Sequence, residues 1–150
     1  MKKLLILLFI LLSLAATAQK RNVVYICLQP NNLGYGLRYD YNFDNVGLYG
    51  SITHGAYKFV EGYIKNHTKV SAGMTFLNKR QTADHDYNFL SMGASYNIYK
   101  SVQYDQLYNT AVFHPVALEI GAGTIIKWFS LAIRYELVKS NVSIDIGIRF

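Results

Sequence analysis

The chain has 150 residues, a formal net charge of +6 and a single cysteine, Cys27. This length fits one domain, and one cysteine excludes an internal disulfide framework and a cysteine-based zinc site. The mild positive charge is spread along the chain, so it gives no support for nucleic-acid binding. Thirteen tyrosines and eight phenylalanines with only two prolines favour β-strands.

The amino-terminal segment has the pattern of a secretory signal peptide. Lys2 and Lys3 precede an apolar run over residues 4–12, and Ala16-Thr17-Ala18 provides an A-x-A cleavage site before Gln19. A single anchoring helix, the competing interpretation, would need about 20 apolar residues. We therefore predict a signal peptide over 1–18 and a mature domain over 19–150, whose net charge is +4 once the two lysines are removed.

Apolar and polar residues alternate with period two along most of the mature chain, which predicts strands with one apolar and one polar face. Gly55 interrupts the third strand and predicts a bulge, because the apolar phase changes after it. Eight strands are expected, and an even number of this size favours a closed barrel whose interior is filled by side chains. They span residues 22–28, 33–43, 46–59, 69–76, 90–98, 116–126, 129–137 and 142–150.

The last strand shows the alternation most clearly. Val142, Ile144, Ile146, Ile148 and Phe150 share one face, and Ser143, Asp145, Gly147 and Arg149 share the other. This pattern resembles the closing strand of bacterial outer-membrane β-barrels, in which the terminal residues are read by the barrel-assembly machinery. The corresponding C-terminal assembly signal would be Ile144, Ile146, Ile148 and Phe150.

From residue 22 to residue 150 the chain resembles small eight-stranded outer-membrane barrels of the OmpA/OmpX, porin-like type. The resemblance implies an all-β, eight-stranded antiparallel up-and-down transmembrane barrel in the outer membrane of a Gram-negative envelope. It also implies the barrel-assembly machinery and periplasmic chaperones as partners during biogenesis. It implies no shared activity and no cofactor, since one fold of this kind carries many roles.

With both termini in the periplasm, the periplasmic turns would be 44–45, 78–86 and 127, and the outer loops 29–32, 61–67, 99–111 and 139–141. An aromatic girdle is then expected at the periplasmic lipid boundary. It would contain Phe43, Phe76, Trp128 and Phe129. Outer-membrane lipids would surround the barrel, and Lys58, Lys65, Lys100 and Lys139 would lie where they can meet the phosphates of lipopolysaccharide.

The polar face carries four positive and four negative groups, while the apolar face of the clear strands carries none. Such a balanced set predicts a hydrogen-bonded plug in the barrel interior. The expected network contains Arg38, Asp40, Lys69, Glu119, Arg134, Glu136, Asp145 and Arg149. Periodicity alone also permits a soluble periplasmic ligand-binding barrel with the apolar face inside; the signal peptide, Phe150 and the glycines of the polar face favour lipid outside.

The sequence provides little support for catalysis. His54, His67 and His114 could join Ser51 or Ser101 and Glu61 in a hydrolase of lipopolysaccharide acyl chains, but no G-x-S-x-G, H-x-H or H-E-x-x-H motif is present. Asp84-His85-Asp86 is expected to be a polar turn. We predict no catalytic, cofactor or metal residues and a structural or surface-interaction role. The competing hypotheses are a small channel and a lipid A-modifying barrel enzyme.

Overall fold

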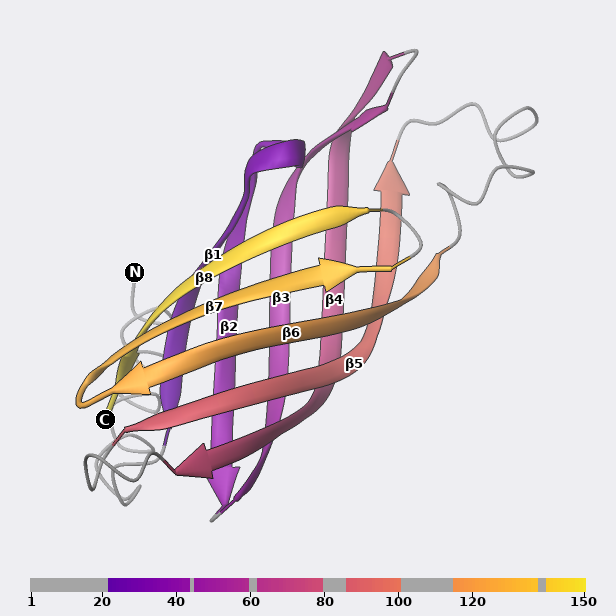
Figure 1. Ribbon diagram of the computed structural model, residues 1–150. Helices are drawn as coiled ribbons and strands as arrows, with labels where there is room; N and C mark the ends of the chain where they lie inside the picture. The colour runs from indigo at the N-terminus through magenta and orange to yellow at the C-terminus, as the bar shows by residue number, and fades with distance from the viewer. Residues whose placement is uncertain (1–21, 44, 60–61, 80–85, 101–114, 138–139) are drawn as a thin grey trace, which may run out of the picture.

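The computed structural model describes residues 22–43, 45–59, 62–79, 86–100, 115–137 and 140–150, which form a closed barrel of tilted strands (Figure 1). The predicted signal peptide lies outside these residues. The strands are β1 (Val23–Gln29), β2 (Gly34–Phe43), β3 (Val46–Phe59), β4 (Gly62–Lys79), β5 (Tyr87–Lys100), β6 (Val116–Ile126), β7 (Phe129–Glu136) and β8 (Asn141–Arg149).

Each strand pairs antiparallel with its neighbours in the sequence, and β1 pairs with β8 to close the sheet. In Figure 1, β1 in indigo therefore lies beside β8 in yellow. The predicted fold class, an eight-stranded antiparallel up-and-down barrel, is confirmed. No helix within the described ranges is long and apolar enough to cross a membrane.

The alternation along the strands places polar side chains inside the barrel and apolar side chains outside. On β7, Ser130 and Arg134 are buried, whereas Leu131 and Ile133 are 39% and 56% exposed. The same alternation appears along β1, where inward residues are buried and outward ones exposed. A water-soluble barrel would keep its apolar face inside, so this barrel is turned inside out relative to that arrangement.

The two ends of the barrel differ in their connections. One end, which we call the terminal end, carries the start of β1 and the end of β8, together with the tight β6–β7 turn at Lys127 and Trp128. Lys127 adopts a positive φ of 53° there. The opposite end, the loop end, carries the 3-10 helix η1 (Pro30–Asn32) between β1 and β2, and also the β3–β4 connection.

Several strands are longer than predicted. β4 begins at Gly62, so the predicted outer loop over 61–67 is wrong for residues 62–67, which belong to β4; Gly62, Tyr63, Ile64 and His67 pair with β3. Lys79 belongs to β4 and Lys100 to β5, which shortens two further predicted connections. The predicted bulge at Gly55 is confirmed by a shift of the β3–β4 register between Gly55 and Tyr57. Alternation of apolar and polar residues marks a strand only where its two faces meet different surroundings. The loop-end part of the β3–β4 hairpin lacks a clear alternation of this kind.

Candidate functional site: the charged network in the lumen

Five strands bring charged side chains into the barrel interior. Seven of the eight predicted interior charges are buried, with at most 2% of their surface exposed: Arg38, Asp40, Lys69, Glu119, Arg134, Glu136 and Asp145. Removing such groups from water costs several kcal/mol for each ion, and only close partners offset that cost. The partners of each group therefore decide whether the arrangement is stable.

Arg38 on β2 contacts two carboxylates. It donates from Nε and Nη2 to the two oxygens of Asp40 at 2.5 and 2.7 Å, which is a bidentate pair. Its Nη1 donates to Oδ2 of Asp145 on β8 at 3.2 Å. Because Asp40 lies two residues along the same strand, alternation alone places it on the same face as Arg38.

Three aromatic rings surround the Arg38 guanidinium. Its Cζ lies 4.3 Å from the ring centroid of Tyr49, 5.1 Å from that of Tyr25 and 5.9 Å from that of Phe89. A cation over an aromatic face is attracted to the ring, and this attraction is stronger where water is excluded. The Arg38 charge is therefore compensated by two carboxylates and by the faces of the rings.

Arg134 on β7 connects the two halves of the network. Its Nε and Nη2 donate to Asp145 at 2.6 and 3.2 Å, and its Nη1 donates to Oε2 of Glu119 on β6 at 3.1 Å. Nη1 also donates to Oγ of Ser51, and Nη2 contacts Sγ of Cys27 at 3.4 Å. A planar guanidinium with several fixed donors can hold all these acceptors at once, which a lysine at this position could not do.

The network continues toward the loop end through Lys69 on β4. Its Nζ lies 2.5 Å from Oε1 of Glu119 and 3.5 Å from Oε2 of Glu136. Glu136 accepts a hydrogen bond from Nδ2 of Asn97 at 3.1 Å, and Oδ1 of Asn97 lies 2.7 Å from Nε2 of His67. The loop-end part of the lumen therefore changes from charged to neutral polar groups.

Six ion-pair contacts join the seven charged groups into one unbroken series across the lumen. The series runs Asp40, Arg38, Asp145, Arg134, Glu119, Lys69 and Glu136. Such a network fixes one arrangement of side chains when each charged group has its partners. Removing one member leaves a buried charge without its partner and destabilises the fold.

An apolar cluster fills the lumen nearer the terminal end. Phe89 is 3% exposed and Ile125 is 2% exposed, and Tyr87 packs against the cluster from one side. The alternation allows either a bulge or inward packing at Phe89, and the ring packs inward. Leu77 and Ile125 were missed as interior residues. Their position in the alternation was the available signal, but their apolar character suggested the lipid face.

Glycines make room for the large interior side chains. A Cβ at Gly73 would lie 2.6 Å from Cε1 of Tyr49, and one at Gly93 would meet the Tyr49 hydroxyl. In the same way, a Cβ at Gly147 would lie 2.5 Å from Cδ1 of Tyr25. The clustering of glycines on the polar face therefore reflects the space that aromatic rings occupy in a narrow barrel.

Arg149 lies apart from the seven buried charges. It is only half-buried at the terminal end, and its Cζ lies 5.3 Å from the ring centroid of Tyr87. The backbone beside it closes the sheet, since Phe150 N donates to Asn22 O at 3.0 Å and Asn22 N donates to Phe150 O at 3.3 Å. Ile146 and Ile148 of the predicted assembly signal are exposed on the outer face, and Ile144 points outward with them.

The four predicted girdle residues are all exposed on the outer side of the terminal end. Their exposed fractions are 49% for Phe43, 41% for Phe76, 64% for Trp128 and 38% for Phe129. The rings of Trp128 and Phe129 meet edge to face with centroids 6.3 Å apart. Aromatic rings at this level suit a lipid–water boundary.

The structure separates the described members of the hypothetical hydrolase. Ser51 is buried in the lumen and accepts a hydrogen bond from Arg134 at 3.1 Å. His54 lies on the outer face, where its Nδ1 is 2.9 Å from Oγ1 of Thr68, whereas His67 is buried inside. Glu61, Ser101 and His114 lie outside the described residues, as do His85 and Asp84. In the part of the chain that is described, no group of three His, Cys, Asp or Glu side chains could hold a metal ion.

Several solved structures have the same barrel architecture as this chain. No protein-family model and no curated protein matches the chain. The outer-membrane protein Ail of Yersinia pestis in a phospholipid bilayer nanodisc has a TM-score of 0.50 and 19% identity, over 88% of this chain and 100% of that chain. A designed transmembrane β-barrel has a TM-score of 0.47 and 15% identity, over 89% and 97% of the two chains.

A crystal structure of Ail in complex with the heparin analogue sucrose octasulfate gives a TM-score of 0.43 and 18% identity, over 87% of this chain and 99% of that chain. At these identities the likeness to Ail in the nanodisc shows the fold. The chain has the fold of the small eight-stranded outer-membrane barrels of the OmpA/OmpX type, with the apolar outer face that a bacterial outer membrane requires.

Proposed function

We propose that this protein is an integral outer-membrane barrel with a closed lumen, and that it acts through its surface in a structural or interaction role. The observation that carries the proposal is the unbroken series of ion pairs from Asp40 to Glu136, which occupies the lumen together with the apolar cluster around Phe89. Eight strands enclose an interior just wide enough for side chains to fill.

The outer face supports the membrane part of the proposal. Among outward-facing strand residues whose side chains are described, none is Asp, Glu, Lys or Arg. An Arg or Lys on this face would cost about 2–4 kcal/mol at the bilayer midplane. A soluble ligand-binding barrel would instead require Arg134 and Asp145 in water and Ile146 and Ile148 inside, and their exposure here is the reverse.

The orientation follows from the two ends of the barrel. With the terminal end in the periplasm, the girdle residues lie at the inner lipid boundary and the loop end faces outward. Outer-membrane lipids would then be permanent partners, and lipopolysaccharide would meet the rim where Lys58, Lys65, Lys100 and Lys139 fall; the side chains of these lysines are not among those described. The barrel-assembly machinery and periplasmic chaperones would be partners during biogenesis only.

Conductance in planar bilayers distinguishes this proposal from a small channel. We expect the purified, folded protein to give no sustained current steps, because the ion-pair series and the apolar cluster would together block the path along the barrel axis. The double substitution Arg38→Ala with Arg134→Ala removes both guanidinium groups and provides the matched control, which we expect to give current bursts. Sustained ohmic steps from the unmodified protein would show that it is a channel.

A further inference from the structure

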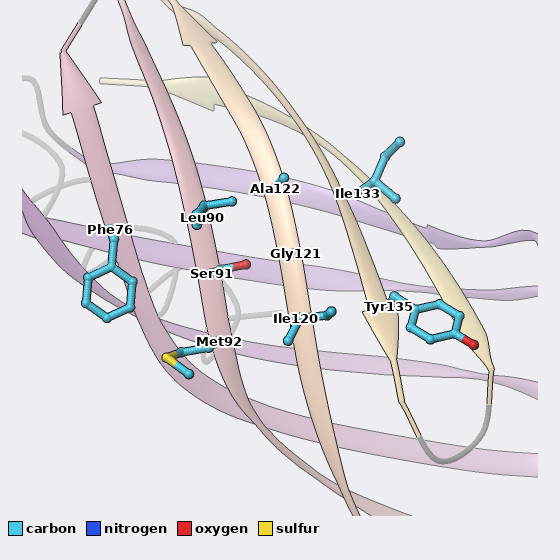
Figure 2. A pocket seen from close by; sticks show the side chains of 9 residues that line it. All are labelled: Phe76, Leu90, Ser91, Met92, Ile120, Gly121, Ala122, Ile133 and Tyr135. Atoms are coloured by element: carbon cyan, nitrogen blue, oxygen red, sulfur yellow. The ribbon is translucent and has the colours of Figure 1, made fainter.

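A shallow, open hollow lies on the outer face of the barrel across β4 to β7. Its volume is about 510 Å³, and its lining is almost entirely apolar. Figure 2 shows Phe76 on β4, with Leu90 and Met92 on β5, forming one wall. Ile133 and Tyr135 on β7 form the other wall, and β6 lies between them.

The hollow exists because the outward side chain of β6 is small at this point. Ala122 pairs with Leu90 on one side and with Ile133 on the other, so a methyl group stands between two large side chains. On the outer face of β6 the neighbours of Ala122 are Ile120, which also lines the hollow, and Thr124, because Gly121 and Gly123 lie on the lumen side of the alternation. The floor of the groove is therefore low only at Ala122, and the Ile120 side chain of β6 bounds it toward the loop end (Figure 2).

The chemistry at the ends of the groove differs. At the loop end, the Tyr135 hydroxyl donates to Oγ of Ser140 at 3.0 Å, so this pair forms a polar edge. At the terminal end, the groove ends at Phe76 and Leu90, and Asn78 and Asn88 lie beyond them as register partners. The groove thus runs within the apolar belt and begins beside a polar group at the outer side.

We infer that this groove is a binding site for one acyl chain of a lipid in the outer leaflet. This inference rests on the membrane location proposed above, and the groove is continuous with the lipid-facing belt of that proposal. Hydrocarbon is the only solvent available at that depth. A flexible acyl chain can lie over Ala122 and pass beside Ile120, with its ester or amide end beside Tyr135 and Ser140.

A second copy of the chain is a poorer occupant. Symmetric dimers place the same surface patch of both subunits in contact. Two hollows facing each other would leave a void, because the walls at Leu90 and Ile133 would meet before the floors did. A void of that kind loses the packing contacts that stabilise an interface.

Filling the floor tests the inference. Ala122→Phe places a ring where the acyl chain would lie, and Ala72→Phe makes the same change at another exposed, outward-facing alanine that is not part of the groove. Each protein would be placed in nanodiscs of phosphatidylethanolamine, with or without lipid A. The lipid molecules that stay bound would be counted by native mass spectrometry after the scaffold protein of the nanodisc is removed. The two compositions show whether the acyl chain comes from phospholipid or from lipid A.

We expect the unmodified protein and Ala72→Phe to retain one lipid and Ala122→Phe to lose it. Equal retention by all three proteins, or equal loss from both variants, would overturn the inference. If the unmodified protein is a dimer and Ala122→Phe makes it monomeric, the acyl-chain inference is overturned, and a second copy of the chain occupies the groove. Membrane fractionation and heat-modifiable gel mobility are measured on the same samples, and Ala122→Leu replaces Ala122→Phe if that variant does not fold. Failure of the unmodified protein to enter the membrane would count against the proposed function itself.

Discussion

Arg134 and Asp145 lie on neighbouring strands and form a two-point ion pair, with N–O distances of 2.6 and 3.2 Å. They are not direct register partners, because Asp145 pairs with Ala132 and Arg134 with Ser143. The side chains meet diagonally across the β7–β8 ladder. The same carboxylate accepts a hydrogen bond from Arg38 at 3.2 Å, so Asp145 is the acid, among the described residues, that contacts both arginines.

Asp145→Ala should destabilise the barrel strongly. It leaves two buried guanidinium groups with one fewer carboxylate, and breaking a buried ion pair costs about 3–5 kcal/mol. The free energy of unfolding in lipid vesicles, measured by urea titration with gel mobility as the readout, should fall by that amount. The control is Ser143→Ala, which removes only the hydroxyl that donates to Asp145 at 2.8 Å. Equal stability of the two variants would mean that the network contributes little.

Leu131→Arg should reduce the amount of protein inserted in the membrane. Leu131 is 39% exposed on the outer face, two residues from the girdle residue Phe129, so an arginine there should cost less than the about 2–4 kcal/mol of a site at the bilayer midplane. Leu131→Met keeps the apolar surface and is the control. Ser130→Arg tests the opposite face: Ser130 is fully buried and is 2.9 Å from the Tyr25 hydroxyl, so an arginine there overcrowds the lumen without meeting lipid. Wild-type amounts of Leu131→Arg in urea-washed membranes would contradict the assignment of faces.

Gly73→Val should impair folding, whereas Gly50→Val should be tolerated. A Cβ at Gly73 meets the Tyr49 ring at 2.6 Å, but a Cβ at Gly50 on the outer face has no neighbour within 4 Å. Overpacking costs about 1–3 kcal/mol, and valine otherwise favours strands. The measurement is the fraction of protein with folded mobility on unheated gels. Similar fractions for the two variants would show that Tyr49 and the β5 backbone at Met92, which the added Cβ also meets, can both move away from β4.

Phe89→Ala should destabilise the barrel by about 3–5 kcal/mol, the usual cost of removing a buried phenylalanine ring. The adjacent change, Leu90→Ala, removes a side chain that is 64% exposed to the surroundings and should cost much less. Urea titration in vesicles compares the two neighbours directly. A larger loss for Leu90→Ala would reverse the assignment of inward and outward residues at this point of β5.

The alternation of residue types predicted much of this fold, because a strand between lipid and a polar lumen must change character at every residue. It predicted the barrel and the inward direction of Arg38 and Asp145. It could not predict that Asp145 joins Arg38 to Arg134, since that contact depends on the stagger of strands that are distant in sequence. It also failed for Leu77 and Ile125, because an apolar residue suits a packed lumen as well as it suits lipid.

Reactivity of the native cysteine tests the closed lumen most directly. Cys27 is fully buried inside the barrel, beside Arg134. A small, charged, water-soluble thiol reagent should leave Cys27 unmodified in the folded, membrane-embedded protein and modify it after unfolding in urea. Asn31→Cys in a Cys27→Ser background is the positive control, because Asn31 is exposed at the loop end. Rapid modification of Cys27 in the folded protein would contradict a lumen filled by its own side chains.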